Sequence, residues 1–175
     1  PHAHRDDAHG GLDPHVWVSP PEVRIIARNI LEALLETDPA NHSTYESSHD
    51  AFLREIEKLD RDLQEVFKDK KGFKFMVYHP AWGYLARAYG LEQVPVEVEG
   101  KEPKPEQLKT LIEESRKQGI KVIFVQPQFS TKSAETLAKA IGGGVVFADN
   151  LREDWEKNLR QQAVKFNEAL HGQTR

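Results

Sequence analysis

The sequence has 175 residues with 24 Lys+Arg against 28 Asp+Glu, a formal net charge of −4 and a pI near 6.1. General nucleic-acid binders are expected to be basic, so we expect no nucleic-acid partner. Cysteine is absent, which excludes thiolate metal sites, cysteine nucleophiles and disulfide frameworks and leaves His, Asp and Glu for any metal chemistry. No stretch approaches the roughly 20 apolar residues that a membrane span requires.

The first part of the chain predicts a loop followed by two helices. Its first fifteen residues, PHAHRDDAHGGLDPH, hold four of the eight histidines and almost nothing apolar. Apolar residues at three- and four-residue spacing then predict a helix from Ser19-Pro20-Pro21 to Asp38-Pro39. A second helical pattern runs from about 41 to 70. About 28 residues at 1.5 Å each would span roughly 42 Å, which predicts a strut between two bodies.

From Gly72 onward, short strand-like runs alternate with helical patterns. The strands are expected at 73–78, 94–98, 121–125 and 145–148, and the helices at 81–89, 105–118, 131–141 and 152–170. Pro95 favours the sheet edge for the second strand, and Ser130 is the expected cap of the third of these helices. The alternation predicts an α/β fold with a parallel sheet of about four strands flanked by helices, preceded by the long connecting helix.

Three polar residues are candidate metal ligands. Two of them follow predicted strands, and open α/β sheets bind ligands at the carboxyl ends of their strands. The third lies just before the first helix. His79 follows the first strand, Asp149 follows the last one, and His15 lies in Asp-Pro-His-Val-Trp. No local spacing joins them. Each also has an ordinary structural interpretation: His79 as a packed strand-end residue, Asp149 as a helix cap, and His15 as a loop residue. We expect the three tryptophans to pack in a hydrophobic core or between two lobes of the protein. They are Trp17, Trp82 and Trp155.

Common catalytic patterns are missing from the sequence. There is no Gly-x-Ser-x-Gly elbow, no GxGxxG or Walker pattern, and no HExxH. The Gly142–Gly144 run follows a predicted helix, so it is interpreted as a connection and not as a phosphate loop.

Several ordered segments together resemble one family. They are DPHVWVSP, VYHPAWGYLARAYGL, EPKPEQLKTL and VIFVQPQFSTKSAETLAKAIGGGVVFADNL. The chain resembles the zinc and manganese substrate-binding proteins of ABC transporters, the ZnuA-like or TroA-like family. This resemblance implies two α/β lobes joined by a rigid helix, with the metal in the cleft between them. It divides the chain into a remnant of the first lobe (1–41), the interlobe helix (42–71) and the second lobe (72–175).

The resemblance implies that His15, His79 and Asp149 are metal ligands, and that a further histidine comes from an upstream part of the first lobe. His2, His4 and His9 are expected as auxiliary ligands. Imidazoles with one carboxylate suit Zn²⁺. Mn²⁺ is less expected because it prefers oxygen ligands, and the manganese members have a carboxylate where His79 stands.

The function implied by the resemblance is capture and not catalysis. The protein would bind the ion in the periplasm or at the outer face of the bacterial cytoplasmic membrane, and deliver it to an ABC permease as a monomer. Two alternatives stay open. One is a metal-dependent enzyme, hydrolase or chelatase-like, that activates a metal-bound water. The other is an adhesin or scaffold that uses the surface of the same lobe.

Overall fold

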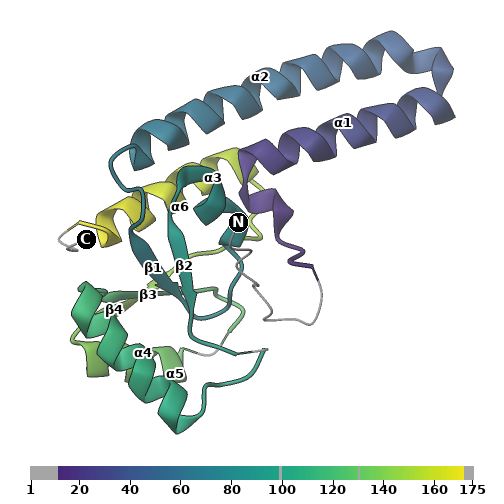
Figure 1. The fold of residues 1–175 in the computed structure, drawn as a ribbon. Coiled ribbons are helices and arrows are strands. Elements are labelled where there is room, and N and C mark those ends of the chain that lie inside the picture. Colours follow the sequence, from purple (N-terminus) through teal and green to yellow (C-terminus); the bar gives the residue numbers. More distant parts are fainter. Residues whose placement is uncertain (1–11, 99, 130, 172–175) are drawn as a thin grey trace, which may run out of the picture.

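The computed structural model describes residues 12–98, 100–129 and 131–171 (Figure 1). The expected auxiliary ligands His2, His4 and His9 lie outside the described residues, and so does the expected helix cap Ser130.

The chain begins with a helical hairpin that projects from the α/β body (Figure 1). A short 3-10 helix, η1 (Val16–Val18), precedes α1 (Pro20–Thr37), and a second one, η2 (Pro39–Asn41), leads into α2 (His42–Phe67). The bounds of α1 agree with the prediction. Proline occupies the start of the helix, and the helix ends before Asp38-Pro39 because a residue before proline disfavours helical geometry. The helix α2 is slightly shorter than the 41–70 span that was predicted.

The sheet has four parallel strands in the order β2-β1-β3-β4. Their bounds are β1 (Lys74–Val77), β2 (Glu92–Pro95), β3 (Val122–Val125) and β4 (Gly144–Phe147). This confirms the parallel α/β prediction and the edge position of the strand that contains Pro95. The predicted 94–98 span is shifted, since β2 begins at Glu92 and ends at Pro95.

Helices cover both faces of the sheet (Figure 1). They are α3 (Gly83–Tyr89), α4 (Pro105–Gln118), α5 (Lys132–Ile141) and α6 (Trp155–Ala169). The left-handed Gly90, with a φ of 71°, ends α3 as expected. Asp154 occupies the N-cap position of α6, so the interpretation of Asp149 as the cap of the last helix is wrong.

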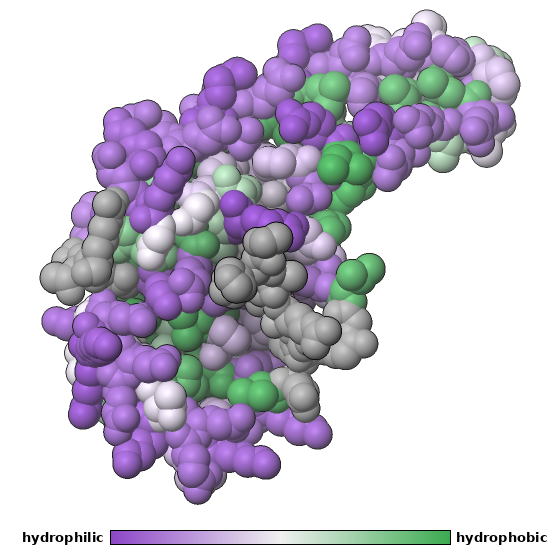
Figure 2. Space-filling view, viewed as in Figure 1, coloured by the Kyte–Doolittle hydropathy of each residue, from purple (hydrophilic) through white to green (hydrophobic). Residues whose placement is uncertain are grey.

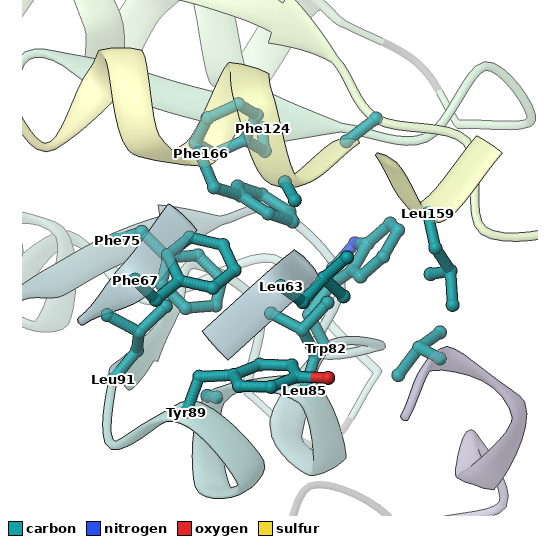
Figure 3. Packing of buried hydrophobic residues seen from close by; sticks show 14 of the residues in the cluster. Leu63, Phe67, Phe75, Trp82, Leu85, Tyr89, Leu91, Phe124, Leu159 and Phe166 are labelled. Carbon is teal, nitrogen blue, oxygen red and sulfur yellow. The ribbon is translucent and has the colours of Figure 1, made fainter. Parts of the chain in front are cut away.

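Alternating strand residues build one core on each side of the sheet. Phe75 and Val77 face the side covered by α2, α3 and α6, whereas Met76 faces α4 and α5. Figure 3 shows the first of these cores, where Phe124 and Phe166 meet edge to face with ring centroids 4.4 Å apart. The last turns of α2 contribute to this same core through Leu59, Leu63 and Phe67. The carboxyl-terminal half of α2 is therefore part of the α/β body.

The amino-terminal half of α2 pairs with α1 and leaves an apolar groove of about 280 Å³. Figure 2 shows apolar surface gathered along this hairpin. Within the groove, Ile30 is 54% exposed and Phe52 38% exposed. Among the described residues, no helix is both long and apolar enough to cross a membrane.

Candidate metal centre

His79 lies just beyond the carboxyl end of β1, and its backbone is fixed there. Pro80 follows it and favours extended geometry at position 79. The carbonyl oxygen of His79 accepts hydrogen bonds from the N–H of Ala81 (2.9 Å) and from Nε2 of Gln126 (3.2 Å), a buried residue just after β3. Two neighbouring strands thus hold the position of this histidine.

The ring of His79 has contacts on one edge and on one face. Its Nδ1 lies 2.9 Å from Oε1 of Glu97, a residue that is only 6% exposed. Phe129 stacks on the ring with a centroid distance of 4.9 Å and an interplanar angle of 20°. Glu97 follows β2, so the histidine and its carboxylate come from adjacent parallel strands.

His15 precedes η1 and is held by a local turn. Oδ1 of Asp13 accepts a hydrogen bond from the backbone N–H of His15 (2.9 Å) and lies 2.7 Å from its Nδ1. The hydroxyl of Tyr84, on α3, donates to the carbonyl oxygen of Asp13 (3.2 Å). Both histidines therefore carry a carboxylate at Nδ1, one from a nearby residue and one from a neighbouring strand.

Two tryptophans fasten the segment of His15 to the α/β body. Nε1 of Trp17 donates to the carbonyl oxygen of Asn150 (2.8 Å), and Nε1 of Trp155 donates to the carbonyl oxygen of Trp17 (2.7 Å). Trp82 is buried in the main core. The packing prediction is confirmed for these side chains, and the hydrogen bonds of Trp17 and Trp155 add a positioning role that the sequence did not indicate.

The structure brings two of the three candidate ligands together. The rings of His15 and His79 meet edge to face, with centroids 5.3 Å apart. Oδ1 of Asp149 instead accepts from the N–H of Leu151 (3.0 Å) and from Nε2 of Gln128 (3.4 Å). Across 12–98, 100–129 and 131–171, no group of three or more His, Cys, Asp or Glu side chains is arranged to hold a metal ion. Asp149 nevertheless adjoins Asn150, to which Trp17 is bonded.

A cavity of about 390 Å³ opens beside His79. Tyr78, Glu97, Glu102 and Phe129 contribute to its wall, together with Gly100 and Lys101. Burial raises the pKa of the Tyr78 phenol, and the charges of Glu102 and Glu97 act in the same direction, while a hydrogen bond with Ser133 opposes them. The phenol is therefore uncharged at neutral pH.

Sequence reasoning missed Glu97 and Phe129 as neighbours of His79. The available signal for Glu97 was a charged residue in the otherwise apolar Val-Pro-Val-Glu-Val run, which predicts a partner if the strand is buried. Phe129 lies in the turn after β3, where no periodicity marks it. The sequence marked Asp13 only as the first residue of the Asp-Pro-His motif and did not predict its contact with Nδ1 of His15.

Comparison with known proteins agrees with this architecture. The chain is 43% identical to a protein whose structure is described as "Crystal structure of ZnuA", with a TM-score of 0.87 over 92% of this chain and 62% of that one. It is 32% identical to the high-affinity zinc uptake system protein ZnuA of Bacillus subtilis, over 85% of this chain and 48% of the relative. Against the zinc-binding protein AdcA of Streptococcus pyogenes serotype M3 it is 30% identical, over 90% of this chain and 31% of the relative.

The parallel sheet and its helical hairpin are thus the α/β fold of ZnuA-like proteins. Residues 1–169 match the family described as zinc-uptake complex component A, periplasmic, and the chain belongs to that ZnuA family. It spans about a third to a half of the two curated relatives named above.

Proposed function

We propose that this chain is the metal-capturing part of an extracytoplasmic solute-binding protein that takes up Zn²⁺ and delivers it to an ABC permease. The observation that carries the proposal is the pair of imidazoles, His15 and His79, each with a carboxylate at Nδ1. Zinc-ligating histidines almost always present such an outer partner, which orients the ring.

The separation of the two rings supports a shared ion. Two imidazoles that coordinate one tetrahedral zinc at about 2.0–2.1 Å place their ring centroids roughly 5 Å apart. The observed centroid distance is 5.3 Å. Asp149 is the proposed third ligand, and it would exchange its contacts with Leu151 and Gln128 for the ion.

The proposed division of labour follows the family architecture. Residues 1–41 would belong to a first lobe that supplies a further histidine, 42–71 would form the interlobe helix, and 72–175 would form the second lobe. His2, His4 and His9 are proposed as auxiliary ligands. Imidazole nitrogens favour zinc over manganese, which prefers oxygen ligands.

The proposed reaction is binding and release, with no bond made or broken in a substrate. Trp17 meets the ring of His15 edge to face, and Phe129 stacks on the ring of His79. Both aromatic side chains limit the access of water to the histidine rings. We place the protein in the periplasm or at the outer face of the cytoplasmic membrane, as a monomer and without a nucleic-acid partner. Turnover of ester or phosphoester substrates by the zinc-loaded protein would favour the enzyme alternative instead.

Calorimetric titration of the metal-free protein with Zn²⁺ tests the proposal. We expect one site, with the affinity reduced at least tenfold, about 1.4 kcal/mol, in His15→Ala and in His79→Ala. Asp149→Asn should lower it less, because the amide keeps one oxygen. His42→Ala is the matched control, since this exposed histidine on α2 lies outside the site. Equal affinity in all of these proteins would refute the assignment.

A further inference from the structure

Glu97 is a buried acid whose carboxylate meets one ring nitrogen. Its side chain is 7% exposed, and Oε1 lies 2.9 Å from Nδ1 of His79. Burying a carboxylate is unfavourable unless a polar partner compensates it. A glutamate at this position therefore requires a reason, and the adjacent histidine supplies it.

Backbone hydrogen bonds place the two partners opposite each other. Beyond β2, the N–H of Val96 donates to the carbonyl of Val77 (2.8 Å), and the N–H of Glu97 donates to the carbonyl of Tyr78 (3.1 Å). The hydrogen-bond ladder of β1 and β2 thus continues to Glu97 on one side and to Tyr78, the residue before His79, on the other. Just after Glu97, the backbones of Val98 and Lys101 exchange hydrogen bonds of 2.9 and 3.0 Å.

This arrangement differs from the one at His15. Asp13 lies two residues from its histidine, is 23% exposed, and also accepts a backbone hydrogen bond in the same turn. The carboxylate of Asp13 is therefore explained by local turn geometry as well as by the ring contact. Glu97 makes a contact between two strands, so a local turn does not account for it.

A carboxylate only accepts hydrogen bonds, so the hydrogen in the short contact belongs to Nδ1 of His79. The neutral ring then has its lone pair on Nε2, the atom that can coordinate a metal. We propose that Glu97 is a positioning residue that keeps His79 in the Nδ1–H tautomer and presents Nε2 to the ion. This inference rests on the proposed function, since it assigns Glu97 a role at the same site.

Stacking on Phe129 adds to the same effect. The ring planes are 20° from parallel at a centroid distance of 4.9 Å, which restricts how the imidazole can tilt. With one face against Phe129 and Nδ1 against Glu97, the ring has one preferred orientation before any metal arrives. Preorganisation of this kind lowers the cost of ordering a ligand on binding.

Nitrogen-15 NMR of the histidine rings in the metal-free protein tests the inference without zinc. At a pH well above the ordinary imidazole pKa of about 6.5, the wild-type ring of His79 should show the Nδ1–H tautomer. Glu97→Gln keeps an acceptor oxygen and should retain it, whereas Glu97→Ala should shift the ring toward Nε2–H. Glu102→Gln is the matched control, because Glu102 lines the same cavity and bonds to Ser133.

The zinc affinities of the same proteins complete the test. We expect a loss of about tenfold in Glu97→Gln, which removes the charge alone, and up to about 100-fold in Glu97→Ala. Glu102→Gln should bind as the wild type does. If Glu97→Ala does not fold by circular dichroism, the ring tautomers of the wild type and of Glu97→Gln decide: Nδ1–H in both supports the role, and Nε2–H in either one overturns it.

The two proposals fail in different ways. A wild-type ring in the Nε2–H form, a tautomer unchanged in Glu97→Ala, or wild-type affinity in Glu97→Ala would overturn the role of Glu97 even if the protein binds zinc. If the wild type shows the expected tautomer but no zinc binding, the proposed function is refuted instead.

Discussion

Replacing Trp17 with phenylalanine should loosen the segment that carries His15. The substitution keeps an aromatic ring but removes the Nε1–H that donates to the carbonyl oxygen of Asn150 at 2.8 Å. Asn150 is a buried residue, and a buried acceptor left without its donor costs about 1–3 kcal/mol. For a domain of this size, a loss of about 2 kcal/mol lowers Tm by about 4–8 °C.

Urea denaturation followed by circular dichroism measures this loss, and calorimetry with Zn²⁺ reports on the site. We expect Trp17→Phe to lose both stability and zinc affinity. His15 lies two residues before Trp17, so loosening Trp17 also loosens the segment that positions His15. Trp155→Phe removes the hydrogen bond to the carbonyl of Trp17 and should have a similar effect. The double variant should lose less than the sum, since both bonds hold one segment. A change below about 0.5 kcal/mol in Trp17→Phe, with unaltered zinc binding, would refute this reasoning.

Two further substitutions test the fold around the site. Gly143→Ala should be strongly destabilising, by about 3 kcal/mol or more, because the added Cβ would lie 1.9 Å from the carbonyl oxygen of Lys121. Thermal denaturation measures this loss. Gly144→Ala is the control, since a Cβ at that position would meet no atom within 4 Å. Burial and the neighbouring Asp60 raise the pKa of Tyr89, whose neutral form the folded state therefore favours. Stability should fall as the pH rises above about 10, the ordinary tyrosine value, and it should fall less in Tyr89→Phe. An equal drop in melting temperature between neutral and alkaline pH in the two proteins would contradict this.

The sequence predicted the α/β class and the parallel sheet because periodicity and turn residues are local signals. The helix at 105–118 begins at Pro105 and ends before Gly119, and the structure confirms both bounds. The edge position of β2 followed from Pro95, which lacks an N–H. Its bounds were less predictable, since pairing with β1 extends the strand to Glu92, which no local pattern indicates.

The site was predictable only in part. His15 and His79 were identified from the motifs around them, and the structure brings their rings together. Their outer partners depend on distant pairings: the register of β1 and β2 sets Glu97 beside His79, and a turn after β3 brings Phe129 onto its ring. The hydrogen bond from Trp17 to Asn150 likewise joins two remote loops. Such contacts are consequences of tertiary packing, so spacing along the chain does not reveal them.

Anomalous scattering at the zinc edge, from crystals of the zinc-loaded protein, tests the metal assignment most directly. We predict one site with Nε2 of both His15 and His79 about 2.0–2.1 Å from the ion. Asp149 should have turned toward the ion from its present contact with Leu151. Zinc found on other side chains, with His15 and His79 both uncoordinated, would contradict the account.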